Sequence, residues 1–197
     1  RQAWSGSGDK KLELIWFDLE HQFGASEFLG YNSTESQAKI LALVVKGIKQ
    51  NQASQNDLVD VVFNQTPFYA ESGGQVTDEG RIFNDLMEGV VENVQKIGNL
   101  LVHKELILNG KISVGDLADL EVDTVRREAI TANHSATHLM HQALKDILGS
   151  HVNQRGSIND NEKIRFDFSH NSPLTADEII LIEDIVNKQI LQDSIVS

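Results

Sequence analysis

Leu117–Gly149 reads "LADLEVDTVRREAITANHSATHLMHQALKDILG" and contains the point at which the hydrophobic pattern changes period. Up to Asp123 apolar and polar residues alternate, as in a half-buried β-strand. From Thr124 to Leu148 the apolar residues recur at helical spacing, and Gly149 suits the position just after a helix C-terminus. The helical apolar positions are Ala136, Leu139, Met140, Ala143 and Ile147. The sequence therefore predicts an α+β fold class, with a β region followed by helical structure.

Seven short apolar runs before Thr124 predict a small antiparallel β structure. Gly, Asn and Asp residues separate the runs, and Gly115-Asp116 is typical of a turn into the last strand. Closing the strands into a barrel would leave no unpaired edges. We therefore expect a small antiparallel β-barrel. Its predicted strands are Leu12–Leu19, Ala38–Gly47, Leu58–Gln65, Gly80–Asp85, Val90–Ile97, Leu100–Ile107 and Leu117–Asp123.

The region after Gly149 has the pattern of a β-hairpin and a second helix. Two runs, His151–Ile158 and Glu162–His170, flank the turn-forming residues Asn159–Asn161. Thr175 and Glu178 then have the spacing of a helix capping box. The apolar stripe predicted for this second helix comprises Ile179, Ile182, Val186 and Ile190.

The composition is that of a folded protein without a membrane span or disulfides. The chain has 197 residues, of which 40% are hydrophobic. Its longest apolar run, Ile40–Val45, is far shorter than the roughly 18 residues that a membrane helix needs. The absence of cysteine excludes a disulfide partner and thiolate ligands, and it suits a reducing, cytoplasmic location. Both ends lack normal terminal signals, so we expect an internal fragment of a longer protein.

The net charge of -12 argues against a protein that holds nucleic acid by bulk electrostatics. The charge is unevenly distributed, however. Residues 1–123 carry ten basic and nineteen acidic side chains, whereas residues 124–170 carry six and five. The second region is the least acidic part of the chain, so contact with nucleic acid is permitted there but is not predicted by charge alone.

Three histidines lie on one side of the predicted helix at 124–148. With about 100° per residue, His134 at 0° places His138 near 40° and His141 near 340°. The five apolar positions named above fall at about 140° to 240° by the same rule. We therefore expect the histidines to face away from the main apolar stripe.

The spacing of His134 and His138 permits a metal site, because imidazoles at i and i+4 can reach one zinc ion. Surface or polar-core histidines are the alternative interpretation. A zinc protease is excluded, because Ser135 occupies the position at which that motif requires a glutamate. The spacing does not select a third ligand; the candidates are His141, His151, Asp167 and His170.

A hydroxyl nucleophile among these histidines is not supported. A serine one residue from a histidine on the same helix does not form a triad, which needs an oriented base within hydrogen-bond reach. Thr137 lies near 300°, on the shoulder of the histidine face, where it could line a pocket.

Three stretches together resemble the editing region of the alanyl-tRNA synthetase family. They are "TPFYAESGGQVTDEG" (Thr66–Gly80), "NHSATHLMHQALKDILGSHVNQRGS" (Asn133–Ser157) and "RFDFSH" (Arg165–His170). The resemblance implies a barrel like those of translation factors, followed by a truncated editing core. On this basis residues 1–25 are expected to be the tail of a preceding helical region and a lead-in, 26–123 the β-barrel domain, and 124–197 the N-terminal part of the editing domain.

The resemblance also implies the site residues. His134 and His138 correspond to zinc ligands, and Thr137 and Gln154 to residues of the substrate pocket; no catalytic residue is implied. The remaining family ligands belong to a downstream Cys-x-x-x-His motif, so the zinc site is expected to be incomplete in this sequence. The glycine pair in "ESGGQ" (Glu71–Gln75) suits either a tight barrel turn or a loop that leans on the editing site.

The implied parent enzyme uses ATP and magnesium, in an aminoacylation domain absent here, to attach alanine to tRNA(Ala). The editing module would hydrolyse mischarged seryl- or glycyl-tRNA(Ala), and the isolated fragment is expected to be inactive. A free-standing editing hydrolase is one alternative. A non-catalytic β-barrel that binds RNA or another partner is the second.

Overall fold

The computed structural model describes residues 7–192, with side chains from Leu12 onward. Contacts divide the chain into two compact units. The first contains residues 7–71 and Thr77–Thr124, and the second contains Ser72–Val76 and residues 125–192. None of the helices within residues 7–192 has both the length and the hydropathy of a membrane span.

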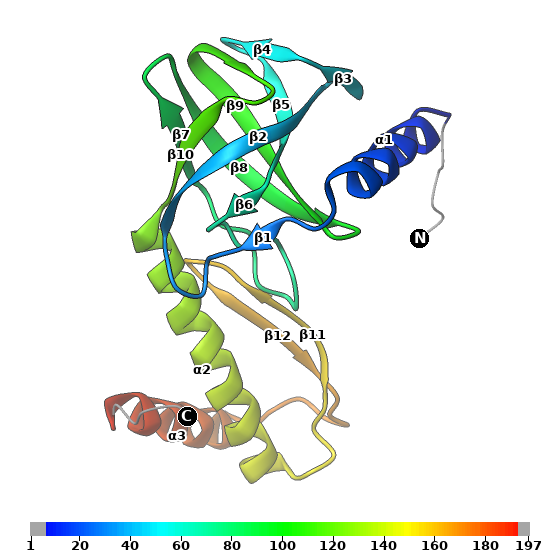
Figure 1. The fold of residues 1–197 in the computed structure, drawn as a ribbon. Helices are drawn as coiled ribbons and strands as arrows, with labels where there is room; N and C mark the ends of the chain where they lie inside the picture. Colours follow the sequence, from blue (N-terminus) through cyan, green and yellow to red (C-terminus); the bar gives the residue numbers. More distant parts are fainter. Residues whose placement is uncertain (1–6, 193–197) are drawn as a thin grey trace. The chain divides into compact units, whose positions relative to one another are not determined.

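Six antiparallel strands of the first unit close into a barrel (Figure 1). Hydrogen bonds join them in the order β10-β7-β8-β9-β5-β2, and β10 also pairs with β2, where Leu117 lies opposite Lys39. This closure confirms the predicted barrel and the α+β class. The strands are β2 (Glu35–Val45), β5 (Leu58–Phe63), β7 (Gly80–Asn84), β8 (Met87–Ile97), β9 (Leu100–Ser113) and β10 (Leu117–Val122).

Four further strands of the first unit are too short for the alternation rule to reveal. β1 (Glu27–Phe28) pairs in parallel with β6 (Gln65–Thr66). β3 (Ile48–Gln50) pairs antiparallel with the end of β2, and β4 (Gln52–Ser54) pairs antiparallel with β9. The barrel interior is filled by one cluster of buried side chains, in which Phe63 and Ile82 are completely buried.

The strand predicted at Leu12–Leu19 is wrong, because these residues belong to α1 (Ser7–Phe23). Their apolar residues also fit a helical period. Trp16 and Leu19 are buried against barrel residues that include Val44 and Val102. The helix residues packed in or around this cluster are Leu12, Ile15, Trp16, Leu19 and Phe23. This spacing of three or four residues defines one face of a helix.

The second unit contains the predicted helix, hairpin and helix. They are α2 (Thr124–Leu148), the antiparallel pair β11 (Gln154–Asn159) and β12 (Ile164–Phe168), and α3 (Ala176–Leu191). At the hairpin turn the backbone N–H groups of Glu162 and Lys163 hold the pKa of Asp160 below its usual range. Thr175 and Glu178 form the expected capping box at the start of α3.

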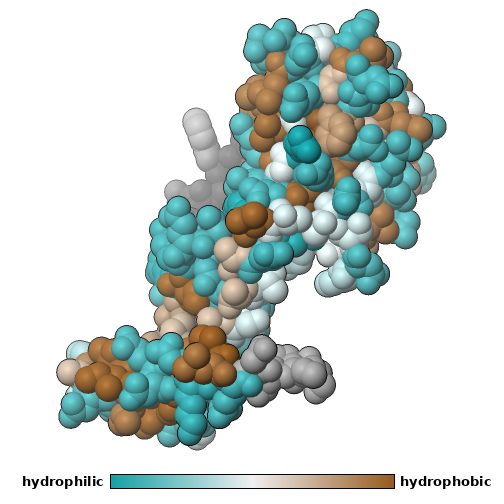
Figure 2. Space-filling model, turned by 90° about the vertical axis from the view of Figure 1, so that its left-hand side faces the viewer, coloured by the Kyte–Doolittle hydropathy of each residue, from teal (hydrophilic) through white to brown (hydrophobic). Residues whose placement is uncertain are grey.

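The apolar faces of both helices differ from expectation. On α2, Thr137 and Leu144 are buried although they lie at about 300° and 280°, next to the histidines. On α3 only Ile182 of the predicted stripe is buried, while Ile179 and Ile190 are 42% and 52% exposed. Figure 2 shows hydrophobic surface on α3. The small core that does form consists of Ala143, Leu144, Val152 and Ile182.

Candidate functional site

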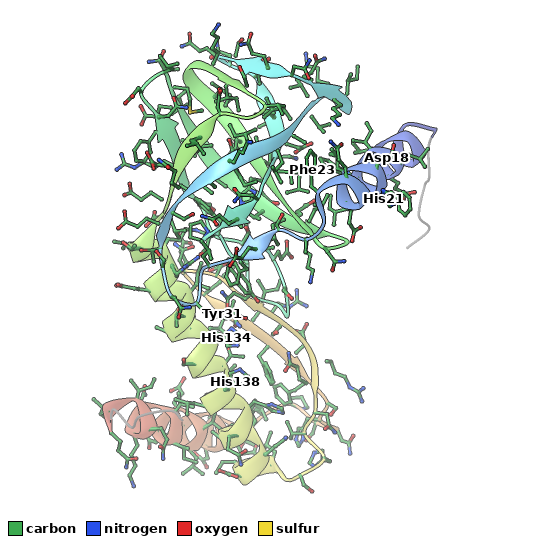
Figure 3. All side chains as sticks on the ribbon, in the orientation of Figure 1. Asp18, His21, Phe23, Tyr31, His134 and His138 are labelled. Atoms are coloured by element: carbon green, nitrogen blue, oxygen red, sulfur yellow. The ribbon has the colours of Figure 1, made fainter. Side chains whose placement is uncertain are left out.

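His134 and His138 project from one side of α2 and meet (Figure 3). Their Nε2 atoms lie 3.0 Å apart, and their ring centroids are separated by 4.9 Å. Two nitrogens bound to a tetrahedral zinc ion at 2.0 to 2.1 Å would be about 3.3 Å apart. The pair therefore fits two positions of a zinc site after a shift of a few tenths of an ångström.

The second nitrogen of His134 is held by a residue far away in the sequence. Its Nδ1 lies 2.7 Å from the side-chain oxygen of Gln75. An amide oxygen only accepts hydrogen bonds, so Nδ1 carries the proton and donates it. The Nε2 atom of His134 is thereby left with its lone pair facing His138.

Gln75 is presented by a loop that lies against β11. The backbone of Asn159 donates to the Gly74 carbonyl at 2.8 Å and accepts from the Val76 N–H at 3.1 Å. Gly74 has φ +85°, and a Cβ there would come within 2.3 Å of Ser157 Oγ. Of the two interpretations of the glycine pair, the structure thus shows the loop leaning on the candidate site.

Thr137 directly precedes His138 on α2 and is hydrogen-bonded to the hairpin. Its Oγ1 lies 2.7 Å from Asn159 Oδ1 and 2.9 Å from the carbonyl of Asn133. A hydroxyl has one proton, which these two acceptors share, while its lone pairs stay available to a donor. Thr137 is 5% exposed, so most of its surface is already used by these contacts.

Gln154 is the first residue of β11. Its side chain contacts Ser157, which is also the strand residue closest to Gly74 of the loop. Its side-chain nitrogen donates to Ser157 Oγ at 3.0 Å. Ser157 Oγ is also the atom nearest to a Cβ built on Gly74. The residues predicted from the resemblance are therefore linked to one another through the loop and β11.

None of the four candidates for a third ligand joins the histidine pair. His141 packs against Phe166, and His151 Nε2 lies 2.9 Å from His170 Nδ1 in a separate pair. Asp167 forms an ion pair with Arg165 at 3.0 Å. Within residues 7–192, no group of three or more metal-ligating side chains converges.

Sequence reasoning missed three residues of this site: Gln75, Ser157 and Asn159. Their roles depend on the docking of the loop on β11, which joins positions far apart in the chain. The glycine pair at Gly73-Gly74 was the only local signal. It indicated a close backbone approach without identifying the partner.

Comparison with known proteins gives consistent matches along the whole chain. The family described as tRNA synthetases class II (A) matches residues 1–126. The alanine–tRNA ligase of Cereibacter sphaeroides (strain ATCC 17025 / ATH 2.4.3) is 47% identical over 196 residues, covering 100% of this chain. Those of Parvibaculum lavamentivorans and Rhizobium johnstonii are 46% and 44% identical, each over 98% of this chain. The chain spans 22% of the length of each of these relatives.

Proposed function

The chain belongs to the class II alanyl-tRNA synthetase family, and from that premise we propose that it carries part of the editing module of a cytoplasmic alanine–tRNA ligase. The full-length protein would attach alanine to tRNA(Ala) with ATP and magnesium. Its editing module would hydrolyse seryl- or glycyl-tRNA(Ala). The meeting of His134 Nε2 and His138 Nε2 beside Thr137 is the observation that carries the editing part of the proposal.

Zinc is the cofactor that this pair suits. His134 and His138 would supply two imidazole ligands, and the family resemblance implies that the others would come from a Cys-x-x-x-His motif of the full-length protein. Bound zinc supplies Lewis-acid chemistry at an ester or a water molecule. The side chains of the pair would bind the ion, while the hydrogen bond from Thr137 on α2 to Asn159 on β11 would hold Thr137 in place beside them.

An editing step is expected on physical grounds, because a pocket for alanine cannot exclude glycine by size. It also rejects serine only weakly, since an apolar pocket gains little discrimination against an added hydroxyl. In the proposed editing pocket the Thr137 oxygen can accept a hydrogen bond from the serine hydroxyl, a contact that the methyl group of alanine cannot make. Gln154, exposed at the start of β11, would lie beside the aminoacyl end.

The test is hydrolysis of seryl-tRNA(Ala) by the full-length protein and its His138→Ala variant. The variant should lose at least about tenfold in hydrolysis rate, because loss of a residue that only supports a metal ligand already costs about 10- to 100-fold in affinity or activity. Attachment of alanine should be unchanged. His21→Ala, an exposed histidine on α1, is the matched control and should behave as the wild type.

Two results would count against the proposal. Equal hydrolysis by wild type and His138→Ala would remove the histidine pair from the reaction. A full-length protein that hydrolyses neither seryl- nor glycyl-tRNA(Ala) would remove the editing function itself.

A further inference from the structure

The hydrogen bond between Gln75 and His134 determines which nitrogen of His134 is free. A neutral imidazole carries one proton, on either Nδ1 or Nε2. Only the deprotonated nitrogen can bind a metal, and the other is commonly fixed by a hydrogen bond from the ring to a neighbouring acceptor. In this structure the acceptor is the Gln75 oxygen, 2.7 Å from Nδ1.

The loop holds the Gln75 carboxamide firmly enough for this purpose. Ser72 and Gln75 exchange backbone hydrogen bonds of 3.0 and 3.3 Å, which close the loop on itself. Asn159 binds the residues on both sides of Gln75, through the Gly74 carbonyl and the Val76 N–H. The side chain of Gln75 is therefore presented to α2 by a backbone fixed at four hydrogen bonds.

The 3.0 Å contact between His134 Nε2 and His138 Nε2 is compatible with this assignment. With its proton on Nδ1, His134 Nε2 accepts a hydrogen bond from His138 Nε2–H across 3.0 Å. The opposite tautomer would place a proton on His134 Nε2, at the point where the two rings meet. In the assigned arrangement the proton at this point belongs to His138 Nε2 instead, and it must leave that nitrogen when the pair binds an ion.

We propose that Gln75 is a positioning residue, which holds His134 in the Nδ1–H tautomer and so aims its Nε2 lone pair at the point shared with His138. The proposal deepens the zinc-dependent editing function and rests on it for its biological meaning. The tautomer itself is a property of the chain without metal. The two can therefore be tested separately.

The first experiment measures the tautomer by long-range ¹H–¹⁵N NMR of histidine-labelled, metal-free chain. Wild type should show the Nδ1–H form at His134. Gln75→Glu should keep this form, because a carboxylate accepts the same proton. Gln75→Leu, which has no acceptor, should shift His134 towards the Nε2–H form, which usually predominates when nothing holds the ring.

The second experiment measures zinc affinity of the full-length protein by competition with a chromophoric chelator. Gln75→Leu should weaken binding by about 10- to 100-fold, the usual effect of losing such a hydrogen bond. Gln75→Glu should bind zinc with the wild-type affinity or more tightly. Gln95→Leu, at an exposed position of β8, controls for the loss of a glutamine and should leave binding unchanged.

The results separate failure of the inference from failure of the proposed function. An Nε2–H tautomer in wild type, or an unchanged tautomer in Gln75→Leu, would overturn the role of Gln75. Equal zinc affinity of wild type and Gln75→Leu would also overturn it. A wild-type protein that binds no zinc would overturn the proposed metal function. The role of Gln75 would then be decided by the NMR measurement of the His134 tautomer alone.

Discussion

Glu105 lies on β9 with its side chain completely buried inside the barrel. Neither carboxyl oxygen has a hydrogen-bond partner among the described residues. Burial without a partner raises the pKa of Glu105 well above its usual value of 4.5. The folded barrel therefore keeps this carboxyl group neutral at pH values at which an exposed glutamate is already ionised.

Glu105 should make the barrel less stable as the pH rises. Above about pH 4.5 the unfolded chain releases the proton that the folded chain retains, so the free energy of unfolding falls until the folded pKa is reached. The decrease can be as large as about 1.4 kcal/mol per pH unit for one proton. Glu105→Gln cannot ionise and should have a flatter profile in urea denaturation between pH 6.5 and 8.

His103, two residues away on β9, explains the choice of this pH window. Burial lowers the pKa of His103 from 6.5 to about 4, so its contribution to stability grows from pH 4 to 6.5 and is then complete. Above pH 6.5 the downward trend of Glu105 is no longer opposed by this histidine. Parallel profiles for wild type and Glu105→Gln in that window would contradict a neutral buried carboxyl group.

Single residues also mark the limit of prediction from sequence. His134 and His138 were identified by their spacing, because a helix brings i and i+4 together locally. Gln75 lies 59 residues from His134, and nothing in the local pattern joins them. Only the docking of the loop on β11 creates that contact.

Among the elements, those with strong local signals were predicted and α1 was not. The capping box at Thr175 and the turn before Lys163 are set by neighbouring residues. The run Leu12–Leu19 fits both a strand and a helix period. The run forms a helix because its apolar face packs against the outer surface of the barrel, where it contacts Val44 and Val102. Tertiary packing of this kind is absent from a local pattern.

The glycine loop offers a matched pair of substitutions. Both Gly73 and Gly74 have positive φ, of +60° and +85°, so alanine is strained at either position. Only at Gly74 would the new Cβ also collide, lying 2.6 Å from the Ser157 carbonyl oxygen. Gly73→Ala should cost about 1 kcal/mol of stability, the usual penalty of the left-handed conformation.

Gly74→Ala should therefore displace the loop, whereas Gly73→Ala should leave it docked. The readout is the His134 tautomer by NMR together with hydrogen exchange of the Asn159 amide, which donates to Gly74. Gly74→Ala should change both and Gly73→Ala neither. Identical spectra for the two variants would show that the close approach to Ser157 does not hold the loop.

At the scale of the whole chain, the closure of the barrel comes from pairing that the sequence does not display. The alternation of β2 and β10 predicts two strands but not that Glu35 pairs with Glu121. The second unit likewise combines α2 and the hairpin with five residues, Ser72–Val76, from the middle of the first. Such long-range assembly explains why element types were easier to predict than their partners.

The two units have separate cores of very different size, and this difference should govern how the chain unfolds. Among the described residues, the barrel core is large and includes Phe63 and Ile82, whereas the second core has four buried members, Leu144 among them. Leu144→Ala should cost about 2 to 5 kcal/mol and should raise hydrogen exchange only in residues 125–192. Ile82→Ala should in turn raise hydrogen exchange only in the barrel strands. Mass spectrometry of exchanged peptides checks both, and faster exchange in both units from either variant would mean that the chain unfolds as one cooperative body.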